Sequence, residues 1–356
     1  MKTYNFSAGP AILPEEVFQE AAEAVRSFTD KGLSILEISH RSKEFQAVMD
    51  EAMALAKELL SIPDTHEVLF LQGGASSQFL TVAINLLSSE ETAGYIDTGS
   101  WSSKAIKEAK LYGKVNTLAS SKDDNYTSIP KGYDIPNDLK YLHITSNNTI
   151  FGTQFQSFPE TVVPIVADMS SDIFSRPIDV SKYGVIYAGA QKNMGPAGTT
   201  VVIVNKDLVK NNVRQVPTIL DYNTHVAKQS MFNTPPTFAI YVSMLTLRWV
   251  KKQGGVTAMQ EKNEQKAQLL YGTIDNSKMF SCPVAPEDRS RMNAVFLIND
   301  DSHNEAFLAA ATAAGCDAIK GHRSVGGFRA SIYNAMPLAG VQTLVDVIQK
   351  FDQANG

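Results

Sequence analysis

Asp168 and Lys192 are the two charged residues whose positions are hardest to explain by packing alone. Asp168 closes the apolar run VVPIVAD, and Lys192 follows the run GVIYAG within the segment AGAQKNMGPAG. An accessible lysine amine can form an imine with a carbonyl compound, and a buried aspartate can keep a heterocyclic nitrogen protonated. The alternative is a buried ion pair between the two residues, without chemistry.

Three short apolar runs position these charges. They lie between Val162 and Val204, are rich in β-branched residues and show no alternation, which predicts strands buried on both faces. In open α/β sheets the ligand crevice lies beyond the carboxyl ends of the strands, so we expect both charges to face one site. Gly189, Gly195 and Gly198 let the backbone pass close to a ligand. Together these features favour an enzyme that uses pyridoxal phosphate (PLP).

A phosphate cradle is expected after the strand Glu67–Leu71. The sequence Gln-Gly-Gly-Ala-Ser-Ser, residues 72–77, leads from this strand into the helix QFLTVAINLL. Such a turn collects free backbone N–H groups at the positive end of a helix dipole. Since the segment matches neither GxGxxG nor a P-loop, an ordinary strand-to-helix turn is the alternative.

Two further residues follow predicted strand ends. Trp101 lies in the first turn of a helix that begins near Ser100, where an indole can stack on a flat ring or simply join the core. Thr149 follows the strand YLHIT and is a candidate hydroxyl ligand.

Cationic residues gather in two segments of a chain with a net charge of −5. His40 and Arg41 precede a helix that Ser42 is expected to cap, and alone they would be read as solvated surface. His322, Arg323 and Arg329 lie in a glycine-rich segment, which marks a local anion site.

The composition excludes several other classes. With 44% hydrophobic and 19% charged residues, the chain is that of an ordinary globular protein, and its pI of about 5.7 makes nucleic acid an unsuitable partner. The start has no signal-like apolar core, and the most apolar helix candidate is too short to span a bilayer, so we expect a cytoplasmic protein without membrane contact. Cys282 and Cys316 have no ligands at metal spacing nearby, so no metal site is predicted.

The length of 356 residues suits two domains. We expect a large domain over residues 15–255 and a small α+β domain over 256–356, joined by the N-terminal segment 1–14. The segment Asn211–Pro235 reads as long and irregular, which is typical of functional loops, disorder or contact with a partner subunit.

The chain resembles the phosphoserine aminotransferases, fold-type-I PLP enzymes of class V. The resemblance runs over the whole length through the motifs NFSAGPAILP, SHRSKEF, QGGASSQF, GSW, NNTIFGTQF, ADMSSDIFSRPID, YAGAQKNMGPAG, FNTPPTFAIY and GHRSVGGFRASIYN. It implies an α/β fold, with a large PLP-binding domain built on a mostly parallel, seven-stranded sheet flanked by helices and a smaller α+β C-terminal domain.

The resemblance also implies roles toward the cofactor. Lys192 matches the Schiff-base lysine and Asp168 the partner of the pyridinium nitrogen. Thr149 matches the hydroxyl that bonds the ring oxygen, and Trp101 the residue stacked on the ring. The phosphate would be held by the positions that match Gly74, Ala75, Ser76 and Gln191 and, from the second subunit of a homodimer, Asn233 and Thr234.

On the substrate side, Arg329 matches the arginine that binds the α-carboxylate. His40 and Arg41, with His322 and Arg323 from the other subunit, match the groups that receive the substrate phosphate. This chain has Ser76 where some members of the family have an arginine, which changes the set of cations without touching the reaction.

The implied activity is transamination between L-glutamate and a phosphorylated 2-oxo acid, 3-phosphohydroxypyruvate. A phosphohydroxythreonine step of vitamin B6 synthesis is a further candidate activity. Alternatives are an alanine- or serine-glyoxylate type aminotransferase, a cysteine desulfurase-like lyase, which needs an exposed reactive cysteine, and a PLP-binding protein without catalysis.

Overall fold

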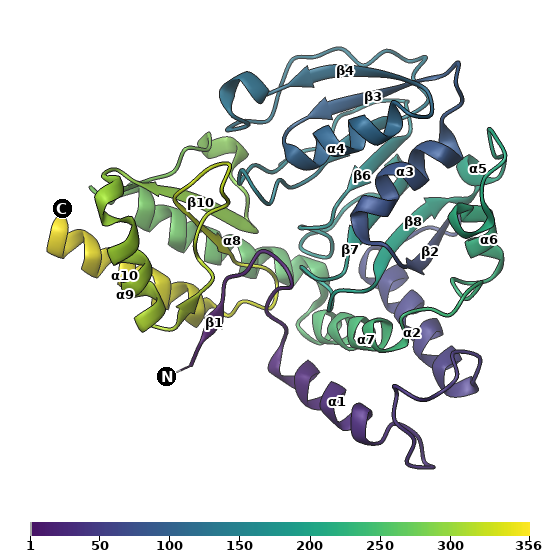
Figure 1. Ribbon diagram of the computed structural model, residues 1–356, viewed down its shortest axis with the longest axis horizontal. Coiled ribbons are helices and arrows are strands. Elements are labelled where there is room, and N and C mark those ends of the chain that lie inside the picture. The colour runs from purple at the N-terminus through teal and green to yellow at the C-terminus, as the bar shows by residue number, and fades with distance from the viewer. Residues whose placement is uncertain (1) are drawn as a thin grey trace.

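A seven-stranded sheet forms the middle of the larger of two lobes in the computed structural model, which describes residues 2–356 (Figure 1). Six strands run parallel, and β8 runs antiparallel to both of its neighbours. In spatial order the strands are β2 (His66–Leu71), β8 (Thr200–Asn205), β7 (Tyr183–Gly189), β6 (Ile165–Asp168), β5 (Leu142–Thr145), β3 (Thr92–Asp97) and β4 (Lys114–Ser120). The predicted mostly parallel sheet is confirmed.

Helices cover both faces of this sheet. α2 (Lys43–Leu59) and α7 (Thr237–Lys252) contribute to the core on one face, with α1 (Glu15–Arg26) outside them, and α3 (Gly74–Leu86) and α4 (Ser100–Ala109) pack on the other. In β2, Val68 and Phe70 join the first core, whereas Leu69 and Leu71 join the second. The strands are therefore apolar on both sides, which is why their sequences do not alternate.

The expected cap of α2 is present, because the Ser42 hydroxyl accepts a hydrogen bond from the backbone N–H of Phe45 at 3.2 Å. The expectation that residues 211–235 are wholly irregular is wrong. They contain the 3₁₀ turn η3 (Thr218–Leu220) and the helix α6 (Tyr222–Ala227). Asp221 caps this helix, because its side chain accepts a hydrogen bond from Asn223 N at 3.0 Å. The cap was not recognised in the sequence because the surrounding segment is mostly polar.

The smaller lobe has its own sheet and core. β9 (Phe280–Ser281), β10 (Asn293–Ile298) and β12 (Phe328–Ser331) form an antiparallel sheet in the order β12-β10-β9. α8 (Gly255–Asp275), α9 (Asn304–Ala313) and α10 (Leu338–Asn355) pack around a cluster of buried aromatic rings. The remaining short elements are α5 (Lys206–Val209), η1 (Lys122–Asp124), η2 (Val180–Lys182), η4 (Pro286–Asp288) and η5 (Asp301–His303).

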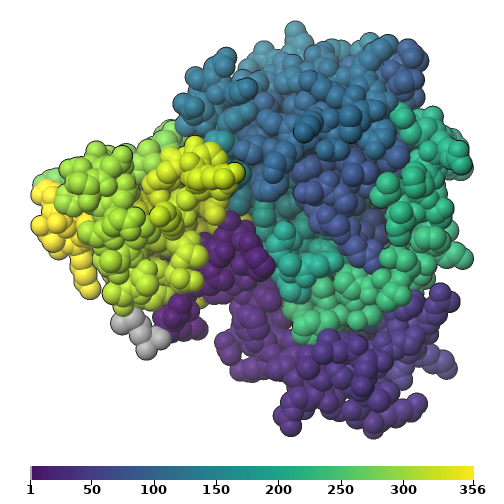
Figure 2. All heavy atoms as spheres, viewed as in Figure 1, coloured from purple at the N-terminus to yellow at the C-terminus, as the bar shows by residue number. Residues whose placement is uncertain are grey.

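The N-terminal segment lies in the seam between the lobes (Figure 2). β1 (Tyr4–Asn5) pairs in parallel with β11 (Cys316–Asp317) of the smaller lobe. Farther on, Ala11 N donates to Gln191 O at 2.9 Å, beside Lys192. The segment thus contacts the smaller lobe and the lysine turn of the larger one.

A buried amide network also joins the lobes. Asn147, after β5, donates to the side chain of Asn293 at 2.8 Å, and Asn293 donates to Ser331 at 2.9 Å and to the Tyr333 hydroxyl at 3.1 Å. Each buried amide thereby finds partners, which offsets the cost of its burial. The network fixes β12, which carries Arg329, against the loop that carries Thr149.

Within residues 2–356, no helix combines the length and the apolar character needed to cross a bilayer.

Candidate active site

The strand register brings four of the predicted site segments to one edge of the sheet. Thr145, Asp168 and Tyr187 lie in one row across β5, β6 and β7. Leu71 and Gly189 lie on either side of Thr200, so the turns after β2 and β7 leave the sheet from the same row. The predicted phosphate turn and the lysine turn therefore begin as neighbours, as expected for a crevice at the carboxyl edge.

Lys192, Thr149 and Arg329 meet at this edge. The Lys192 amine donates to the Thr149 hydroxyl at 2.7 Å, and Nη1 of Arg329 donates to the Thr149 carbonyl at 3.4 Å. The three residues come from the turn after β7, the loop after β5 and strand β12 of the other lobe. A single threonine thus links the predicted cofactor lysine to the predicted carboxylate-binding arginine.

Lys192 and Asp168 do not form an ion pair. Within residues 2–356, the Lys192 amine has Thr149 as its hydrogen-bond partner, and Oδ1 of Asp168 accepts from Ser170 N at 2.9 Å. Burial raises the pKa of Asp168, although the nearby Lys192 charge opposes this shift. The structure therefore does not support the alternative of a simple buried ion pair between Lys192 and Asp168.

Burial lowers the pKa of Lys192 to about 8, and the charge of Arg329 pushes it in the same direction. Only the neutral amine can attack a carbonyl group. We expect the rate at which cofactor-free protein reacts with PLP to rise with pH around a midpoint near 8, followed by absorbance in stopped flow. A midpoint near 10, the range of an ordinary lysine, would contradict this assignment.

Trp101 lies beside the lysine, with its ring centroid 5.9 Å from the Lys192 amine, and its indole N–H is buried without a partner. Asp97 at the end of β3 fixes this part of α4, because it accepts hydrogen bonds from Ser102 and Ser103 at 2.8 and 2.9 Å. Lys104 was not among the predicted site residues, yet its amine lies 4.4 Å from the centroid of the same ring. Its spacing of three residues from Trp101 on one helix was the available signal.

The turn after β2 has the backbone of an anion cradle. Gly73 and Gly74 have φ angles of 94° and 66°, and α3 begins at Gly74 with no acidic residue in its first turn. Ala75 and Ser76 follow in that turn, where N–H groups have no intrahelical acceptor. The Ser77 hydroxyl donates to the Gln72 and Gly74 carbonyls, so it stabilises the loop and is not a free ligand.

Asn233 and Thr234 precede α7, and the Gln72 side chain donates to the Thr234 carbonyl at 2.8 Å within one chain. Gln191 turns back over its own loop, where a side chain at Gly189 would come within 2.7 Å of Gln191 Oε1. The expectation that Gly195 makes room for a ligand is wrong. A Cβ there would lie 2.3 Å from the Ser243 hydroxyl, so this glycine permits packing of the lysine turn on α7.

The two predicted anion-binding segments differ in placement. The loop between α1 and α2, which carries His40 and Arg41, lies away from β10 and the smaller lobe (Figure 1). Nε2 of His40 is buried without a partner, and Arg41 is exposed. His322, by contrast, has its pKa lowered by partial burial and then by the charges of Arg329, Arg323 and Lys104 of its own chain.

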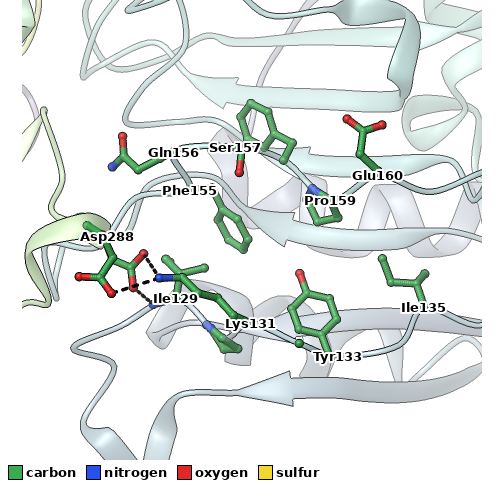
Figure 3. Close-up of a pocket in the computed structure, with 14 residues that line it drawn as sticks. Ile129, Lys131, Tyr133, Ile135, Phe155, Gln156, Ser157, Pro159, Glu160 and Asp288 are labelled. Atoms are coloured by element: carbon green, nitrogen blue, oxygen red, sulfur yellow. Dashed lines mark hydrogen bonds and ion pairs between the residues drawn. The ribbon is translucent and has the colours of Figure 1, made fainter.

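A separate cavity of about 510 Å³ lies where residues 129–135 face residues 155–160 (Figure 3). Lys131 forms an ion pair with Asp288 at 3.2 Å on one side of it, and Asp288 also accepts from Ile129 N at 2.9 Å. None of the predicted site residues lines it. The contacts of Asp288 hold the segment that follows β4, at Ile129 and Lys131, against the smaller lobe.

The chain matches the family model of class V aminotransferases over residues 3–344. It is 57% identical to phosphoserine aminotransferase of Flavobacterium johnsoniae over 353 residues, which cover 99% of each chain. The solved structure of phosphoserine aminotransferase from Bacillus circulans subsp. alkalophilus superposes with a TM-score of 0.97 at 45% identity, covering 100% of this chain and 99% of that one. The PLP-bound enzyme from Trichomonas vaginalis gives 0.93 at 38% identity, covering 98% and 100%. This chain therefore belongs to the phosphoserine aminotransferase family, within the class V aminotransferases.

Proposed function

We propose that this protein uses PLP to transfer the amino group of L-glutamate to 3-phosphohydroxypyruvate, giving O-phospho-L-serine and 2-oxoglutarate in serine biosynthesis. The observation that carries the proposal is the meeting of Lys192 and Arg329 at Thr149, with the buried Asp168 near enough for its charge to act on Lys192. The relatives that carry the name phosphoserine aminotransferase support the choice of substrates. A phosphohydroxythreonine analogue is a second proposed substrate. The cytoplasmic location and the domain division at residue 255 stay predictions.

The residues at this edge fit PLP. Among residues 2–356, the indole N–H of Trp101 and Nε of Arg329 are buried polar atoms without hydrogen-bond partners, and the first turn of α3 offers N–H groups and contains no acidic residue. Lys192, Thr149, Trp101 and Asp168 would hold the ring, and the turn at Gly74–Ser76 the phosphate. When bound, PLP supplies a protonated ring that accepts the electron pair left at the substrate Cα.

Lys192 is suited to move a proton at the substrate Cα. Its pKa of about 8 leaves part of the population neutral near neutral pH, so the amine can accept a proton and return it. Asp168 is suited to hold a proton on a ring nitrogen by charge, since it is only 4% exposed and solvent screens it little. Thr149 positions the Lys192 amine by accepting its hydrogen bond.

Arg329 would bind the α-carboxylate with its guanidinium fork, which matches carboxylate geometry. His40, Arg41, His322 and Arg323 would receive the distal anion, either the phosphate or the side-chain carboxylate of glutamate. A neutral substrate would leave these groups without a counter-charge.

Substrate charge gives the direct test of the proposed function. With glutamate as donor, we expect kcat/KM for 3-phosphohydroxypyruvate to exceed that for hydroxypyruvate by roughly 100-fold or more, since one charge-assisted contact contributes about 1.5–3 kcal/mol and several are available. Alanine should be a poor donor for the same reason. Equal use of hydroxypyruvate and its phosphorylated form would favour a glyoxylate-type aminotransferase instead.

The cysteines give no support to a desulfurase reaction. Cys316 is fully buried, and burial raises its pKa to about 11. Cys282 is half-buried, its pKa is raised by burial, and its thiol points to the Val284 carbonyl at 3.9 Å. A nucleophilic cysteine needs the opposite, a lowered pKa and an open loop.

We further propose a homodimer in which each active site draws on both subunits. Leu33 and Leu36 are exposed to 42% and 59% next to the His40–Arg41 loop, and Phe232 is exposed to 39% next to Asn233. Apolar side chains at these places suit coverage by a second copy. The distance of the α1–α2 loop from the smaller lobe supports the same idea, because one chain alone does not place all the expected cations together (Figure 1).

Mixing inactive variants tests the shared site. Lys192→Ala protein is mixed with Arg323→Ala protein, and separately with Arg41→Ala protein, under conditions that exchange subunits. If the second residue crosses the interface, half of the dimers are mixed and one of their two sites is intact, so roughly a quarter of all sites regain activity. The mixture that recovers identifies the crossing segment. Mass spectrometry must confirm exchange, and no recovery in either mixture would refute the shared site.

A further inference from the structure

Lys104 is a cation at the mouth of the proposed site that none of the roles above uses. It lies one helical turn after Trp101 on α4, and its amine is 4.4 Å from the indole centroid. The Lys192 amine lies 5.9 Å from the same ring. Trp101 therefore has two lysine amines near its ring, the partly buried Lys192 and the exposed Lys104.

Within residues 2–356, no carboxylate lies within ion-pair distance of the Lys104 amine, whereas Arg248 and Arg289 on other surfaces each hold an acidic partner. After the larger effect of burial, the charges of Arg329, Arg323 and Lys104 each lower the pKa of His322. Arg329, Arg323 and Lys104 thus lie close to His322 and form a cationic rim in a chain of net charge −5.

We propose that Lys104 is a further specificity-determining residue, which binds the distal phosphate or carboxylate of the substrate through its ammonium group at the rim beside Trp101. The assignment rests on the proposed function, since it takes each substrate to carry a second anionic group distal to its α-carboxylate. A rim of like charges is unfavourable by itself, and a multiply charged anion removes that repulsion.

The alternative is that Lys104 only covers the Trp101 ring. A cation–π contact at an exposed position contributes about 0.5–1 kcal/mol and is indifferent to the charge of a substrate. The two readings therefore differ in one measurable property, the dependence of binding on the charge of the ligand.

The test compares Lys104→Gln with Lys107→Gln in the PLP-loaded protein. Lys107 lies on the same helix and is also exposed, so it controls for net charge. Binding of O-phospho-L-serine and of L-serine is followed through the absorbance of the cofactor. We expect Lys104→Gln to weaken binding of O-phospho-L-serine about tenfold, the loss of one charge-assisted contact at a partly exposed site, and to leave L-serine unchanged.

Three further readouts sharpen the test. Lys104→Arg should restore most of the affinity, and in turnover the loss should appear in KM with kcat preserved. By NMR, the pKa of His322 should rise in Lys104→Gln and stay unchanged in Lys107→Gln, because only the former removes a cation that lowers it. An unchanged His322 pKa would overturn the placement of Lys104 beside that turn.

The outcomes separate this inference from the proposed function. If Lys104→Gln and Lys107→Gln bind O-phospho-L-serine as the wild type does, or if Lys104→Gln loses L-serine equally, Lys104 is not a specificity residue. If the wild type binds O-phospho-L-serine in a Lys104-dependent way but does not transaminate it, the proposed reaction fails and the anion contact stands. If the wild type binds no O-phospho-L-serine, both fail.

Discussion

Lys192→Ala protein is expected to lose turnover by at least about four orders of magnitude, because the substitution removes both the nucleophilic amine and the proton carrier. The substitution removes the hydrogen bond of 2.7 Å that the Lys192 amine donates to the Thr149 hydroxyl. It removes no core packing, so the fold should persist. Borohydride reduction followed by peptide mass mapping should find the cofactor on Lys192 in the wild type and no modified peptide in the variant.

The matched control is Lys107→Ala, which removes an exposed lysine outside the site and should keep full activity. A small primary amine added to Lys192→Ala should restore part of the rate, since it can take over the proton transfer. A wild-type-like adduct on another lysine of the variant would refute the assignment of Lys192.

Asp168→Asn is expected to lower kcat by roughly 10³-fold or more, the size seen when a charge that stabilises a reaction intermediate is removed. The side chain is nearly fully buried, and asparagine keeps the shape and the acceptor for Ser170 N, so the change is in charge and not in packing. The measurement is kcat at saturating substrates, with the melting temperature as a check of folding.

Asp172→Asn is the control for this variant. Asp172 is also buried, four residues away, and contacts Ser146, Gln154 at 3.1 Å and Arg176 at 3.5 Å, none of them at the lysine. Loss of its charge should lower the free energy of unfolding by a few kcal/mol, as expected for a broken buried ion pair. The effect on kcat should be smaller than that of Asp168→Asn. A decrease in kcat of less than about tenfold for Asp168→Asn would refute its role as the ring partner.

The interior of the large sheet and the ends of its strands could be predicted from the pattern of residues along the chain. Apolar β-branched runs without alternation can be satisfied only by burial on both faces, and the polar residue that closes each run must lie at an edge. Asp168 and Lys192 could therefore be assigned to one crevice from the positions of these runs. The Ser42 cap was readable for a similar reason, since a cap depends on residues three positions apart.

Which side chains meet at that edge depends on contacts between segments that are far apart in the sequence. The contacts of Thr149 with Lys192 and Arg329 span 43 and 180 positions, and they depend on strand order and on how the smaller lobe is seated by Asn293. Gly195 looked like a ligand-facing glycine, but its neighbour is Ser243 of α7. The cationic rim around Lys104 could not be predicted either, because it joins α4 to the distant turn at His322. Local patterns report on spacing over a few residues along the chain, whereas packing between distant segments decides which partner each side chain receives.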